Sequence, residues 1–259
     1  MPDSPRRRRL RASLLLAVLA VAVLGAGCGG ASGPTTLTVL ASASLTEAFG
    51  EIGTAYQQEN PDVRFRFEFG SAPEMVERLS EHYPGDVVVT ADKASMNEAD
   101  EYLAGRRRTI ANTSLTIAVA PGNPRHINEL RDLRRRGLRV AVGAGTVPVG
   151  RYTRQVLAKA GVSVQWSSQE ISARAVLDRI RSGEADAGIV YVTDLRSAGV
   201  AVSSVPIPAD VNVTAAFPAA VVRDGDHEDA ANEFVSWLVT APAQKLFNKY
   251  GFATPSSPQ

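Results

Sequence analysis

The sequence has 259 residues, a net charge of +1 at pH 7, one cysteine and three histidines. A net charge this small provides no electrostatic footprint for nucleic acid. One cysteine excludes an internal disulfide, and one cysteine with three scattered histidines does not form the spacing of a metal site, so core packing must hold the fold together.

The first residues form a signal-peptide pattern. Five arginines between Arg6 and Arg11 precede the apolar run Leu14–Leu24, which is shorter than the roughly 20 residues that a membrane-spanning helix needs. Small residues then lead to Cys28. We expect residues 1–27 to be removed on export. The loss of five arginines and Asp3 changes the net charge from +1 to −3, so the exported body is mildly acidic.

The residues before Cys28 resemble the lipobox of bacterial lipoproteins, in which the cysteine is diacylated and becomes the new amino terminus. The resemblance implies a lipid anchor at Cys28, which places the protein at the outer face of the cell membrane. Lipoboxes usually carry leucine three residues before the cysteine, whereas this chain has Gly25 there. A buried or incidental free thiol is the alternative for Cys28. Residues 28–35 are small and turn-forming, as expected for a tether.

From Thr36 onward, short apolar β-type runs alternate with segments of helical period, which predicts an α/β fold. The runs at 87–89 and 116–120 lack polar alternation, as in strands covered on both faces, whereas 63–69 alternates strictly and is expected near a sheet edge. The expected strands are Leu37–Ala41, Val63–Phe69, Asp86–Thr90, Leu115–Ala120, Leu138–Val142, Gly188–Val192 and Ala215–Val222. The expected helices include Met96–Ala104, Asp229–Val239 and Ala243–Tyr250.

Two proline-containing breaks suggest a division into lobes. Pro121–Pro124 and Pro206–Pro208 each follow an expected strand. They predict a first lobe over 36–120, a second over 121–208, and a return to the first over 209–259.

Ser44 and Ser71 each stand where a helix is expected to follow a strand. Both open an S-x-x-E segment, which predicts a capping box with serine at the N-cap. Such helix amino termini point out of the carboxyl edge of the sheet, where unpaired N–H groups and a serine hydroxyl can bind an anion. Simple capping is the alternative for either serine.

Three later positions are further candidates. The glycine-containing segment 143–150 precedes another helix, but it lacks the Gly-Lys-Ser/Thr of a P-loop and the third glycine of a dinucleotide fingerprint. Pro148 near the helix start leaves the N–H of Val149 free to face a ligand. Ser172 and Ala173 likewise begin a helix. Tyr191 closes a strand, where its phenol could donate to a ligand or simply fill the core.

Several of these segments, in order and spacing, resemble the periplasmic molybdate-binding proteins of ABC transporters. They are ASASLTEAF (41–49), FGS (69–71), DVVVTAD (86–92), VAVGAGTVPVGRYTRQVL (140–157), GIVYVTD (188–194) and AQKLFNKYGF (243–252). The resemblance implies an α/β, two-lobed type II periplasmic-binding-protein fold, with two crossover strands and a central anion cleft.

The resemblance also implies which atoms meet the anion. Ser44 and Ser71 would supply hydroxyl and backbone N–H groups, Val149 and Ala173 backbone N–H groups, and Tyr191 its phenolic O–H. The chain departs from the family pattern in three places: Ala72 replaces a second serine, residue 149 is usually alanine, and residue 173 is commonly valine.

The implied function is capture of molybdate, or the nearly isosteric tungstate, by a monomer that serves an ABC permease and needs no cofactor. Molybdenum would be bound only as the oxyanion. Neutral donors can replace the water around a dianion and disfavour a protonated guest such as phosphate. Sulfate, an iron-oxyanion complex or a small carboxylate remain alternatives, the last through Arg151 or Arg174, although surface roles are expected for both.

An enzyme is the rival class. Ser44 as a nucleophile would need a base, but His82, His126 and His227 lie in polar, surface-like contexts, and no G-x-S-x-G elbow exists. The sequence therefore favours binding over catalysis.

Overall fold

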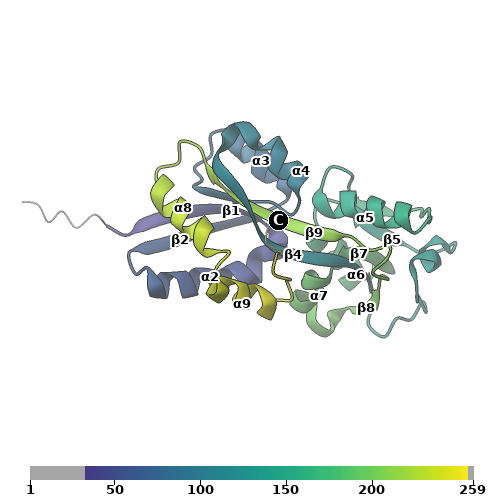
Figure 1. The fold of residues 1–259 in the computed structure, drawn as a ribbon. Helices are drawn as coiled ribbons and strands as arrows, with labels where there is room; N and C mark the ends of the chain where they lie inside the picture. The colour runs from purple at the N-terminus through teal and green to yellow at the C-terminus, as the bar shows by residue number, and fades with distance from the viewer. Residues whose placement is uncertain (1–32, 256–259) are drawn as a thin grey trace, which may run out of the picture. The chain divides into compact units, whose positions relative to one another are not determined.

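A computed structural model describes residues 33–255, drawn in colour in Figure 1. The expected signal peptide, Cys28 and most of the tether lie outside the described residues, so the predictions for them stay predictions. Within residues 33–255, we find no helix with the length and apolar character needed to cross a membrane.

The elements alternate between strand and helix along most of the chain, as the pattern predicts. The strands are β1 (Thr35–Ser42), β2 (Val63–Gly70), β3 (Val87–Val89), β4 (Leu103–Val119), β5 (Val140–Gly143), β6 (Ser168–Glu170), β7 (Ala187–Tyr191), β8 (Ser203–Pro206) and β9 (Thr214–Val222). The α-helices are α2 (Thr46–Glu59), α3 (Ala72–Ser80), α4 (Lys93–Glu98), α5 (Pro148–Lys159), α6 (Ala173–Arg181), α7 (Val192–Ala198), α8 (Glu228–Trp237) and α9 (Ala241–Lys249).

The strands pair in the order β2-β1-β3-β9-β4-β7-β5-β6, with β8 also on β4. The first half of the sheet contains β2, β1, β3, β9 and the Leu103–Ser114 part of β4; the second half contains Leu115–Val119 of β4 with β7, β8, β5 and β6. The chain thus enters the second half along β4 and returns by β9 (Figure 1). The predicted lobe boundaries at 121 and 208 stay a prediction.

The first half is covered by helices on both faces. Alternate residues of β1 point to opposite sides: Val39 packs with the core that includes α2, α8 and α9, whereas Leu40 packs with side chains of α3 and α4. Val88 of β3 joins Leu40, while its neighbours on either side face the larger core. This explains the absence of polar alternation at 87–89, and β2 is indeed an edge strand.

One predicted helix is wrong. Residues 96–104 do not form a single helix, because α4 ends at Glu98, a 3₁₀ turn covers Asp100–Tyr102, and β4 begins at Leu103. The polar stretch after Leu103 is a strand because it pairs with β9 through Ser114, and β9 lies far along the chain.

Candidate functional site

The five predicted binding positions share one cavity. Ser44, Ser71, Val149, Ala173 and Tyr191 all contribute to its lining. Each lies at or just after the carboxyl end of a strand, and within each half these strands (β1 and β2; β5, β6 and β7) run parallel to one another, so the residues gather at the same edge. The structure therefore brings the candidate residues together from both halves of the sheet, and their role as ligands stays a prediction.

Ser44 does not cap a helix, contrary to the sequence-based expectation. A 3₁₀ turn, Ala43–Leu45, joins β1 to α2, and the N-cap of α2 is Leu45. The hydroxyl of Thr46 closes this turn by donating to the Ala43 carbonyl at 2.8 Å. The tight corner places Ser44, only 8% exposed, at the cavity with its hydroxyl free of any capping role.

Ser71 is an N-cap, as predicted. Its Oγ accepts a hydrogen bond from the N–H of Glu74 at 3.3 Å, which leaves the hydroxyl proton available to a guest. Glu74 does not complete the capping box, because its carboxylate pairs with Arg78 at 2.9 Å. Ser172 repeats the same cap at α6 by accepting from Ala175 at 3.1 Å.

The start of α5 is set by a close approach of backbone to backbone. A Cβ added to Gly150 would lie 1.8 Å from the Ala144 carbonyl oxygen, and one added to Gly143 would lie 2.6 Å from the Gly150 nitrogen. The glycines therefore let the helix start pack directly on the end of β5. In this first turn the N–H of Val149 has no intrahelical acceptor, and the residue lines the cavity. Ala173 stands at the equivalent first turn of α6.

Tyr191 carries an unsatisfied polar atom. Its side chain is 2% exposed, and its hydroxyl has no hydrogen-bond partner. The ring is held edge-on by Tyr152 and Phe217, at centroid distances of 6.4 and 5.7 Å. Burial raises the pKa of Tyr191 well above its usual value, so the phenol keeps its proton and remains a donor. Core filling accounts for the ring but not for the unpaired hydroxyl.

A buried carboxylate that the sequence analysis does not single out lies beside this site. Asp194 is in the first turn of α7 and 1% exposed, and neither of its oxygens has a hydrogen bond of ordinary geometry. Burial raises its pKa to about 6, although the nearby Ser44 hydroxyl, the charge of Arg174 and the Tyr191 N–H act in the opposite direction. No pattern in the local sequence distinguishes it from an exposed turn aspartate.

The cavity is small and its lining is uncharged. Its volume is about 20 Å³, little more than the roughly 10–15 Å³ that a cavity needs to hold one water. Its lining residues are all neutral: Ser42, Ala43, Ser44, Gly70, Ser71, Ala72, Ala91, Val147, Pro148, Val149, Ile171, Ser172, Ala173 and Tyr191. A larger hollow of about 470 Å³ elsewhere on the described surface is lined by charges of both signs, from Asp100, Arg107, Arg223, Asp224 and Glu228, and so differs from this neutral cavity.

The two arginines near the helix starts are not solvated surface groups, which corrects the expectation for both. Arg151 pairs with Asp92 and Arg174 pairs with Glu47, each in the other half of the sheet, and neither arginine lines the cavity. Bidentate recognition of a carboxylate guest by either guanidinium therefore has no support in this arrangement.

No base lies beside Ser44 among the cavity-lining residues. His82 and His227 line another hollow, and His126 is in an exposed loop. Across residues 33–255, no group of three or more histidine, cysteine or carboxylate side chains could hold a metal ion.

Comparison with known proteins identifies relatives of the whole domain. The molybdate-binding protein ModA of Mycobacterium tuberculosis is 33% identical over 229 residues, which cover 88% of each chain. A putative ABC transporter substrate-binding lipoprotein of Bacillus subtilis, YvgL, is 27% identical over 93% of this chain and 97% of its own. The solved periplasmic molybdate-binding protein of Azotobacter vinelandii superposes with a TM-score of 0.73 at 20% identity, covering 85% of this chain and all of that one.

The last similarity shows a shared fold, that of the type II periplasmic binding proteins. Residues 37–253 match the sequence model of a protein family that is described as "bacterial extracellular solute-binding protein". Its members and the relatives above are solute-binding proteins rather than enzymes. This chain belongs to the family of bacterial extracellular solute-binding proteins.

Proposed function

We propose that this protein captures molybdate, or tungstate, outside the cytoplasm and delivers it to the permease of an ABC importer. The observation that carries the proposal is the Tyr191 hydroxyl, which is buried, protonated and without a partner in the cavity that also contains Ser44 and Ser71. An oxyanion at this position would accept from that hydroxyl. The molybdate-binding relatives support the choice of anion.

Neutral donors suit such a guest for an energetic reason. A dianion loses its hydration on burial, and this cost is offset only if converging N–H and O–H groups replace the water. The cavity lining offers hydrogen-bond donors and no cation. A guest that carries a proton, as phosphate partly does, would leave its own O–H without an acceptor, so phosphate is disfavoured. The donors come from both halves of the sheet, so a bound anion would stabilise the closed arrangement of the halves as lobes, and the permease would recognise that arrangement.

The membrane attachment is part of the same proposal. Cys28 lies outside the described residues, and its support is the signal-peptide pattern together with the relative that is named a lipoprotein. A diacylated Cys28 followed by the short tether would hold the binding domain at the outer face of the membrane.

The choice of anion is tested by ligand-dependent thermal stability. We expect molybdate and tungstate to raise the unfolding temperature strongly, because a ligand that binds only the folded state stabilises it by mass action. Sulfate and phosphate at the same concentration should produce little change. An equal rise with sulfate would contradict the proposed selectivity while leaving an oxyanion site in place.

The roles of single donors are tested by calorimetric titration with molybdate. Ser44→Ala and Tyr191→Phe should each weaken binding by about 1–3 kcal/mol, the usual effect of losing a hydrogen bond to a charged partner. Tyr152→Phe is the matched control, because its hydroxyl accepts from Ala216 at 3.3 Å and does not line the cavity. Unchanged affinity in Tyr191→Phe would remove the phenol from the site.

A further inference from the structure

Two arginines of the second half reach across to the first half beside the cavity. Arg151 follows Val149 by two residues in α5, and Arg174 directly follows Ala173 in α6. Both side chains are largely shielded, with exposed fractions of 22% and 31%. Each arginine is therefore tied to a helix start that lines the cavity, although neither guanidinium lines it.

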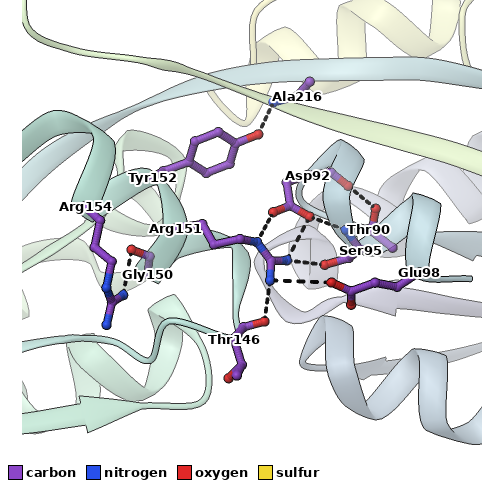
Figure 2. Close-up of polar contacts among 10 residues, drawn as sticks. All are labelled: Thr90, Asp92, Ser95, Glu98, Thr146, Gly150, Arg151, Tyr152, Arg154 and Ala216. Atoms are coloured by element: carbon purple, nitrogen blue, oxygen red, sulfur yellow. Dashed lines mark hydrogen bonds and ion pairs between the residues drawn. The ribbon is translucent and has the colours of Figure 1, made fainter. Parts of the chain in front are cut away.

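Arg151 makes the more extensive set of contacts (Figure 2). Its Nε and Nη2 donate to the two oxygens of Asp92 at 2.7 and 3.1 Å, and Nη2 also donates to the Ser95 hydroxyl. Its Nη1 donates to the Thr146 carbonyl at 2.6 Å, which orients the guanidinium from its own half. The side chain of Asp92 is only 6% exposed and caps α4 by accepting from the Ser95 N–H at 2.8 Å.

Arg174 forms the second connection. Its Nε donates to the carbonyl of Ala43 at 2.8 Å, and Nη2 donates to the carboxylate of Glu47. Ala43 immediately precedes Ser44, so this contact holds the backbone of a candidate donor. Glu47 is 38% exposed, so solvent screens this pair more than the pair made by Arg151.

We propose that Arg151 and Arg174 are positioning residues that clamp the two halves around the anion, and that the Arg151–Asp92 pair is the stronger clamp. The inference rests on the proposed function only for the identity of the anion. In an open form, Asp92 would regain water. In a closed form without Arg151, its charge would be buried without a partner, which is strongly unfavourable. The arginine thus makes closure possible at this point.

The clamp is tested with Arg151→Met in the full chain, and Arg154→Met is the matched control. Arg154 lies in the same helix, but its contacts, to the Gly150 carbonyl at 3.0 Å and to Gln169 at 3.2 Å, stay within the second half. We expect Arg151→Met to release molybdate about 10- to 100-fold faster in stopped-flow measurements, since an unpaired buried charge opposes closure. Its preference for molybdate over sulfate should be unchanged, because the guanidinium does not touch the cavity.

Small-angle X-ray scattering without any anion separates this proposal from the proposed function. Arg151→Met should have a larger radius of gyration than the wild-type protein, whereas Arg154→Met should match it. This comparison of radii needs no anion, so it remains valid even if the wild-type protein binds none of the oxyanions. Absence of oxyanion binding would overturn the proposed function but not the clamp. A radius and a release rate equal to those of Arg154→Met would overturn the clamp.

A double variant tests the physical reason. Asp92→Asn/Arg151→Met removes the uncompensated charge while asparagine keeps the cap of α4. The double variant should release molybdate at a rate close to that of the wild-type protein. If it released molybdate as fast as Arg151→Met, the charge-burial explanation would be refuted. If Arg151→Met fails to fold, Arg174→Met provides the same measurements with a smaller effect of about two- to fivefold, as expected for a more exposed pair; no change there would then overturn the clamp.

Discussion

Replacing Gly150 with alanine is expected to destabilise the fold by about 3 kcal/mol, at the upper end of the usual range for overpacking, and to abolish molybdate binding. The new Cβ would lie 1.8 Å from the Ala144 carbonyl oxygen and 2.4 Å from that of Gly143. Both obstacles are backbone atoms and cannot rotate away. The start of α5 must therefore shift, and the N–H of Val149 would shift with it.

Gly145→Ala is the matched control for Gly150→Ala. The nearest atoms that a Cβ there would meet belong to the guanidinium of Arg154, at 3.2 Å, and that flexible group can move aside. Chemical denaturation and calorimetric titration of both variants provide the comparison. If Gly150→Ala bound molybdate with wild-type affinity, the close approach of α5 to β5 would not position the site.

Asp194→Asn is expected to stabilise the protein at pH 8 by on the order of 2–3 kcal/mol. The pKa of Asp194 is raised to about 6 in the folded protein by burial, against an ordinary value of 3.8. The folded state therefore binds this proton more tightly than the unfolded state. The stabilisation associated with it is complete below about pH 4 and is lost as the pH rises through about 6.

The wild-type protein and Asp194→Asn should accordingly converge below about pH 4, diverge as the pH rises from about 4 to about 6, and keep a constant difference up to about pH 8, as measured by urea denaturation across that range. Asp178→Asn is the control, because this carboxylate is 70% exposed, and its profile should run parallel to that of the wild-type protein. A constant difference between wild type and Asp194→Asn at all pH values would contradict a titrating buried carboxylate.

Anion binding should depend on the same group. A dianion next to Ser44 would raise the pKa of Asp194 further, so binding would be accompanied by proton uptake and would strengthen as the pH falls from 8 towards 6. The groups that act on Asp194 are Ser44, Arg174, Glu47 and the Tyr191 N–H. The binding enthalpy measured in buffers of different ionisation enthalpy would report the proton, and Asp194→Asn should abolish that buffer dependence.

Much of the site was accessible from local sequence because helix starts after strands have a recognisable pattern. Ser71, Val149 and Ala173 were located by their places at helix starts, and all three line the cavity. Ser44 also lines the cavity, but the local reason expected for its place is wrong, since a 3₁₀ turn and not a capping box holds it. Tyr191 was an ambiguous aromatic in the sequence, and only its unpaired hydroxyl separates a ligand from core filling.

The sequence by itself determined the α/β alternation, the doubly covered strand β3, the edge strand β2 and the candidate donors, because these depend on which side of each element is buried. Only the tertiary structure decided that the polar start of β4 is a strand, that Asp194 is buried, and that Arg151 meets Asp92 59 residues away while Arg174 meets Glu47 127 residues away. The local hydrophobic period of a segment shows which face of that helix or strand is buried. Contacts between distant segments depend instead on how the two halves of the sheet come together.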